Sequence, residues 1–309
     1  MSPTAAESTT TTERPASAGI IPKGAGLGVL LALLATVVWS GSFVVARALH
    51  ETVPPIQNAF WRWIIAIVVV APFAGRAAWR KRRLIRRHLG YLVLASLLGI
   101  TVYNTLVNQA GLTTPAANMG MIMAASPVLM AVYERFTGTR LGVRRITGML
   151  IACAGVLLLV GRGGFPTRFG AGDLWMFGAA VAFAAYSVLL KHRPHEIDGA
   201  VFLLITFLLG AVMLLPAYVA SLAVQGGFAF VPDTVGPLVY VGIFSSAVAF
   251  LAWNRSIALI GAARAGVVYY LQPVCVALLS LALLGETLGL LGMGCMVLIL
   301  GGVALSSAR

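Results

Sequence analysis

Long apolar stretches, separated by short polar connections, run along most of the chain. Their residues do not alternate between apolar and polar, and each stretch approaches the roughly 20 residues that a helix needs to cross a bilayer. Helices are the predicted elements, because a spanning helix satisfies its backbone hydrogen bonds internally. The predicted spans are 27–48, 56–75, 89–110, 115–135, 143–161, 172–191, 199–221, 235–256, 264–284 and 288–306.

Composition strengthens this interpretation. Of 309 residues, 60% are hydrophobic and 10% are charged, whereas a soluble domain carries roughly 25% charged residues. Residues 1–26 differ, since they are rich in Ser, Thr and Pro and predict a disordered polar tail. That tail lacks the charged start and cleavage site of a secretory signal, so we expect the first span to be retained.

The net charge of +13 predicts a topology. The basic residues cluster between apolar runs and do not form one face, which argues against a nucleic-acid partner. With ten spans and a cytoplasmic N-terminus, 18 of the 22 Lys and Arg residues lie on the inner side. Because cytoplasmic loops carry the excess of positive charge, both termini are predicted to be cytoplasmic.

Part of the chain repeats itself. Residues 90–155 align without gaps on 236–301 at an offset of 146, with 13 of 66 positions identical. Matches of small residues are common in membrane helices, so the scarcer types carry more weight. The two most informative pairs are Asn108 with Asn254 and Pro127 with Pro273.

The repeat predicts the fold class, an all-α integral membrane protein of ten transmembrane helices. It contains two five-helix units, 27–161 and 172–306. Because five is odd, the second unit must be inverted in the membrane relative to the first. Inverted repeats are typical of secondary transporters, in which the site lies between the two halves.

Pro127 and Pro273 are the candidate hinges. Each falls about halfway along a predicted span, where a proline removes one backbone hydrogen bond and frees a carbonyl. A gating or cavity role is one interpretation, and a packing kink is the other.

Several polar, aromatic and methionine side chains within the spans are candidates for binding a solute. Amides and hydroxyls inside a membrane need a partner, aromatic rings suit apolar groups, and methionine adapts its shape. Helix packing and an interfacial position are the alternatives. The candidates are Trp39, Ser42, Tyr103, Asn104, Asn108, Asn118, Met119, Tyr186, Trp253, Asn254, Tyr269 and Gln272.

Other chemistry is missing from the sequence. No acidic residue lies near the middle of a span, and the four histidines lie near span ends or in loops. The three cysteines have no ligand spacing, and no Walker loop is present. We therefore expect no enzyme, cofactor, metal site or ATP coupling. Arg62 is the one charge well inside a span, and we favour a structural, outward-snorkelling role over anion or carbonyl binding.

These features together resemble the EamA family of the drug/metabolite transporter superfamily. Trp39 near Ser42 in the first span and the stretch from Gln272-Pro273 to Gly285-Glu286 are similar to that family. Thr139-Arg140 departs from it, standing where Gly-Glu is expected. Within the superfamily the chain most resembles the YddG-type amino-acid exporters.

The resemblance implies a multi-pass protein of the bacterial inner membrane. It would export small polar or amphipathic solutes from a central cavity, aromatic amino acids among them. Its partners would be the solute and the lipid bilayer, as a monomer or weak homo-oligomer. The alternatives are a broad drug and metabolite exporter, a multi-span membrane enzyme, or a non-transporting receptor.

Overall fold

The computed structural model describes residues 24–126, 128–129, 132–133, 142–160, 170–190, 192–269, 271–287 and 289–307, and within these ranges every regular element is a helix. The elements are α1 (Ala25–Ala48), α2 (Pro55–Arg80), α3 (Arg82–Arg87), α4 (Leu89–Ser96), η1 (Leu97–Val102), α5 (Tyr103–Ala110), α6 (Ala116–Met123), α8 (Val143–Val160), α9 (Ala171–Leu190), α10 (Gly199–Gln225), α11 (Pro232–Tyr240), η2 (Val241–Val248), α12 (Ala249–Tyr269), α13 (Gln272–Leu284) and α14 (Leu290–Ser307).

The long helices are apolar along their length and on their outer faces. Among the described residues, six helical stretches are long and apolar enough to cross a membrane. They are α1, α2, the run from α4 to α5, α9, α10, and the run from Pro232 to Ile260. Large apolar side chains such as Leu30, Val68 and Phe73 lie exposed on their outer faces, where a bilayer would cover them. The prediction of helices is confirmed for the described residues, and the six long apolar stretches are consistent with the predicted membrane spans.

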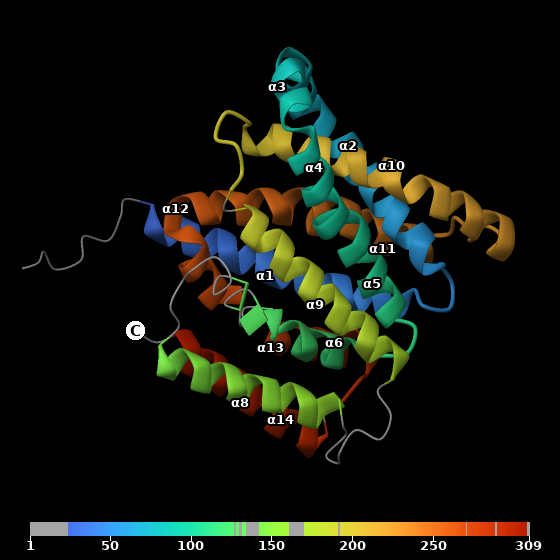
Figure 1. Ribbon diagram of the computed structural model, residues 1–309. Coiled ribbons are helices and arrows are strands. Elements are labelled where there is room, and N and C mark those ends of the chain that lie inside the picture. Colours follow the sequence, from blue (N-terminus) through green and yellow to red (C-terminus); the bar gives the residue numbers. More distant parts are fainter. Residues whose placement is uncertain are drawn as a thin grey trace, which may run out of the picture.

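Helices of the first half of the chain pack against helices of the second half. The closest pairs are α8 with α14, α1 with α12, and α2 with α10, while α5 packs on α9 (Figure 1). The α8–α14 pair, green and red in Figure 1, lies along one edge of the bundle. Its helices approach closely because Gly302 lies against the backbone of α8 and Gly155 lies against Ile299 of α14, as in other small-residue contacts between membrane helices.

Three helix boundaries recur 146 residues apart, the offset of the sequence repeat. They are the starts of α1 and α9, the ends of η1 and η2, and the ends of α6 and α12. η1 and η2 are π-helical, a rare widening of the helix that often occurs at functional positions. The Asn104 amide of α5 donates to two carbonyls of η1, those of Gly99 (3.2 Å) and Ile100 (3.1 Å). The same backbone irregularities therefore occur at matching positions in both halves.

Two sequence predictions need correction. The predicted connection between 256 and 264 is helical, since α12 continues to Tyr269; this stretch is rich in alanine and lacks proline. Pro273 lies in the first turn of α13, where its missing N–H does no harm, and not midway along a helix. A proline cannot bond to the carbonyl four residues before it, which explains why α12 ends at Tyr269.

Other predictions fall on residues outside the described ranges. Pro127 is one of them, although α6 ends four residues before it. The tail prediction for residues 1–23 and the Thr139-Arg140 departure are two more.

Candidate functional site

Aromatic rings fill the centre of the bundle. The Trp39 ring lies 5.3 Å from Trp253, 5.4 Å from Phe250, 6.1 Å from Tyr269 and 6.3 Å from Phe183, measured between centroids. Phe183 and Tyr269 stack on each other at 5.6 Å. All five side chains are buried. We call these residues, with Tyr103, the aromatic cluster.

Both halves of the chain contribute to the aromatic cluster. Trp39 comes from α1 and Tyr103 from α5, which reaches Phe183 of α9 at 5.4 Å. The remaining three rings come from α12. Of the predicted site residues, the structure thus brings together Trp39, Tyr103, Trp253 and Tyr269. Sequence reasoning missed Phe183 and Phe250, because nothing local distinguishes them from the other phenylalanines of apolar runs.

Three predicted site residues carry buried polar atoms without a partner. The hydroxyl of Tyr186, Nδ2 of Asn254, and both side-chain atoms of Gln272 have no hydrogen bond of good geometry among the described residues, although the Gln272 side chain lies beside the Tyr269 hydroxyl. Gln272 is only 1% exposed. An unsatisfied buried polar group costs about 1–3 kcal/mol, so such groups in a native structure call for an explanation. A bound solute would provide one.

Other predicted site residues are satisfied within their own helices. The Ser42 hydroxyl donates to the Trp39 carbonyl at 2.7 Å, and the Asn108 amide donates to the Asn104 carbonyl at 2.8 Å. Met119 is buried in the core, whereas Asn118, its neighbour in α6, is partly exposed. In this conformation the side chains of Ser42, Asn104 and Asn108 therefore stabilise the local helix through hydrogen bonds to nearby carbonyls.

Arg62 does not snorkel, contrary to the favoured sequence interpretation. Its side chain is 4% exposed, because α2 packs against α10, η2 and α5. The guanidinium donates from Nε to Ser246 Oγ (2.9 Å), from Nη1 to Asn104 Oδ1 (2.7 Å), and from Nη2 to Ser245 Oγ (3.2 Å). It also lies 5.1 Å from the centroid of the Trp63 ring. Arg62 therefore joins η2 of the second half to α5 of the first.

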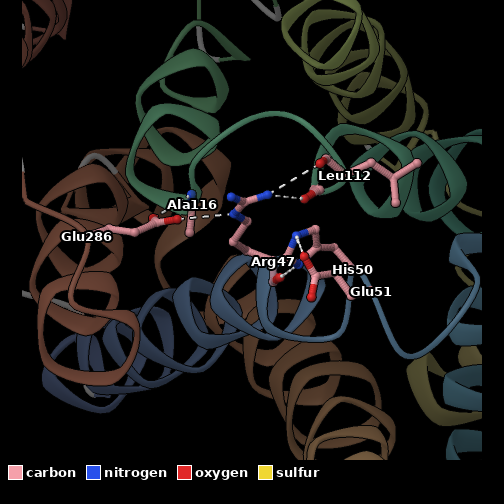
Figure 2. A network of polar contacts seen from close by, with 7 residues as sticks. Arg47, His50, Glu51, Leu112, Ala116 and Glu286 are labelled. Atoms are coloured by element: carbon pink, nitrogen blue, oxygen red, sulfur yellow. Dashed lines mark hydrogen bonds and ion pairs between the residues drawn. The ribbon is translucent and has the colours of Figure 1, made fainter.

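A second polar network ties three helices at one end of the bundle, the end that the charge pattern places outside (Figure 2). Arg47 of α1 pairs with Glu286 at 3.2 Å and donates to the carbonyls of Gly111 and Leu112, both at 3.3 Å. The other Glu286 oxygen accepts the Ala116 N–H at 3.0 Å. Glu286 thus lies at the N-terminus of α6, where a negative charge is favoured. The network joins α1, the turn before α6, and the segment after α13.

The EamA-like transporter family model matches residues 26–161 and 170–308. The chain belongs to the EamA-like transporter family. This confirms the family predicted from the sequence.

Its relatives are transporters as well. A transporter of Archaeoglobus fulgidus is 27% identical, covering 83% of this chain and 89% of its own length. A protein of Streptantibioticus cattleyicolor with the name "Probable terminal-alkyne amino-acid exporter" is also 27% identical, covering 82% and 84%. The inner membrane transporter YedA of Escherichia coli is 26% identical over 84% of this chain and 83% of its own.

A solved crystal structure supports the fold. It superposes with a TM-score of 0.64, covers 90% of this chain and 95% of its own, and shares 24% sequence identity. The family and its relatives thus identify a multi-span membrane transporter that acts on a small-molecule solute.

Proposed function

We propose that this transporter exports small amphipathic metabolites, most of all amino acids with apolar or aromatic side chains, across the bacterial inner membrane. The observation that carries the proposal is the aromatic cluster, which takes rings from α1 and α5 of the first half and α9 and α12 of the second. A site shared between two halves is the arrangement that alternating access requires. The relative from Streptantibioticus cattleyicolor with the name "Probable terminal-alkyne amino-acid exporter" favours the same solute class.

The aromatic cluster also suggests how the solute would be held. In this conformation the rings contact one another and fill the centre, so a solute would enter as the halves rock apart. Ring faces would then contact its apolar side chain. The unsatisfied groups of Tyr186, Asn254 and Gln272 would bond its polar end. Trp39, Tyr103, Trp253 and Tyr269 are the ring contacts in this proposal.

Two five-helix units, related by an inverted repeat, are the second part of the proposal. The recurrence of helix boundaries at an offset of 146 supports it. So does the match of the family model to two ranges, 26–161 and 170–308, that follow the predicted units closely. Five spans in each unit make ten in all, which would place both termini on the same side of the membrane, and the charge pattern makes that side the cytoplasm. The YddG-type assignment would apply to the whole chain.

Counterflow in proteoliposomes tests the proposal. Purified protein would be loaded with one amino acid and offered a labelled panel, with and without a pH gradient. We expect exchange of apolar and aromatic amino acids that does not depend on the gradient, because the spans lack a central carboxylate. Exchange of cationic drugs but of no amino acid would favour the broad drug exporter. No exchange of any solute would refute the transport proposal.

Trp253→Ala is the matching mutational test. Removing this ring takes away two contacts of the aromatic cluster, with Trp39 and Tyr269, so exchange should slow by about tenfold while the protein still folds. Trp79→Ala is the control, because Trp79 is 72% exposed at the end of α2. Equal rates in the Trp253→Ala variant and the wild type would remove this ring from the site.

A further inference from the structure

Arg62 is a buried cation that no carboxylate of the described residues pairs with. Its side chain is 4% exposed, and its three hydrogen bonds go to the neutral side chains of Ser246, Asn104 and Ser245. The ion pairs in the described part of the chain do not include it. An uncompensated charge is expensive inside a membrane protein, where ionisable residues usually mark a binding site or a transport path.

The guanidinium also has bonding capacity left over. It carries five N–H donors, and its three bonds use one on each nitrogen. One N–H on each terminal nitrogen therefore has no acceptor among the described residues. Trp63, whose ring lies beside Arg62, has an unsatisfied buried N–H as well. Both neighbours on α2 lack an acceptor, so the missing partner is one that accepts hydrogen bonds.

Arg62 lies at the edge of the aromatic cluster. Ser245 contacts both, since its hydroxyl accepts from Arg62 while its carbonyl accepts from the Trp39 indole N–H at 2.9 Å. On the other side, Asn104 bonds Arg62 and directly follows Tyr103 of the aromatic cluster. A solute among the rings would thus have a positive charge within reach of one end.

We propose that Arg62 binds the carboxylate of the transported solute. This inference deepens the proposed function and rests on it. Two terminal N–H groups suit the two oxygens of a carboxylate, which guanidinium binds in parallel. The ring faces would attract the ammonium group of an amino acid, and the unsatisfied groups of Tyr186, Asn254 and Gln272 would add hydrogen bonds to the same polar end. Arg62 thus selects carboxylic acids against amines of the same shape.

The test compares acids with their amides on the purified protein. The probes are L-phenylalanine and L-leucine beside phenylalaninamide and leucinamide, which keep the side chain and the ammonium group but lose the negative charge. Binding is measured as the rise in Tm, and transport as counterflow. We expect the acids to bind at least tenfold more tightly than the amides. Equal binding of acids and amides, or no binding of any acid, would overturn the inference.

Variants then assign the selectivity to Arg62. In the Arg62→Gln variant the acids and the amides should bind with nearly equal affinity. Arg62→Lys keeps the charge without the planar fork, so its ratio of acid affinity to amide affinity should lie between those of the wild type and Arg62→Gln. Arg76→Gln is the control, because it removes an exposed arginine of the same helix and should leave the ratio unchanged. If Arg62→Gln does not fold, the comparison of acids and amides on the wild type still decides whether the protein binds the carboxylate. An unchanged ratio in a folded Arg62→Gln variant would contradict the inference.

Two further outcomes separate this inference from its alternatives. A chloride titration in methanesulfonate buffer asks whether the site holds only an inorganic anion. Stabilisation by chloride that the acids do not exceed would overturn carboxylate binding. Arg62-dependent acid binding without counterflow would refute transport and keep the site, whereas counterflow without acid selectivity would keep transport and refute the site.

Discussion

Replacing Glu286 with glutamine should loosen the junction of α1, α6 and the end of α13. The substitution keeps the shape of the side chain and removes its charge. It therefore breaks the 3.2 Å ion pair with Arg47 and weakens the 3.0 Å hydrogen bond from the Ala116 N–H. Figure 2 shows both contacts. No other contact of the network depends on the Glu286 charge.

The expected loss of stability follows from the exposure of the Arg47–Glu286 ion pair and from the hydrogen bond at the N-terminus of α6. The Arg47 and Glu286 side chains are 27% and 19% exposed, so the ion pair contributes about 1 kcal/mol after screening by solvent. A hydrogen bond to a charged group at a helix N-terminus exceeds a neutral one by about 1 kcal/mol. The sum is about 2 kcal/mol, which lowers Tm by about 4 °C in a domain of this size.

Thermal unfolding by tryptophan fluorescence, at one scan rate, measures this loss. A double-mutant cycle with Arg47→Gln should give a coupling of about 1 kcal/mol, because the two charges contact each other directly. Glu51→Gln is the control at the same end, since Glu51 is 82% exposed in its contact with His50. Strict additivity of the two substitutions, or an equal loss in the control, would refute the reasoning.

Three further predictions concern other features. Gln272→Leu should raise Tm by about 2 °C while slowing exchange, because it removes an unsatisfied buried amide; a fall in Tm with exchange intact would identify a packing residue. Gly302→Ala should lower Tm by about 2–4 °C, since the added Cβ meets the backbone of α8, whereas Gly301→Ala has open space and should not. Phosphatase fusions after Gly226 and after residue 309 should report opposite sides of the membrane, and the same side for both would refute the predicted topology.

The sequence predicts the bounds of a span better than the surroundings of a single residue within it. The predicted span 89–110 has the bounds of the run from α4 to α5, because length and apolarity are local properties. Pro273 was placed mid-span, since the sequence does not show that α12 continues to Tyr269 before the break. Arg62 was expected to reach outward, because its distance from the span end was known and the residues around it were not.

Within the site, the sequence identified residue types but not their partners. Asn104, Asn108 and Gln272 looked alike as amides inside spans. In the structure the first two are bonded within their own helices, the first also to Arg62, and only Gln272 keeps both side-chain atoms unsatisfied. Residue type alone does not decide whether an amide bonds to its own helix, to another helix or to neither.

The sequence by itself determined that the chain is helical and that it spans a membrane, and it predicts that its two parts are related. Each of these follows from the length, apolarity and spacing of residues along the chain. Tertiary structure decided which rings meet around Trp39, and that Ser245, 183 residues from Arg62, contacts its guanidinium. The physical reason is that these contacts depend on how helices pack, and packing is set by shape across the whole bundle.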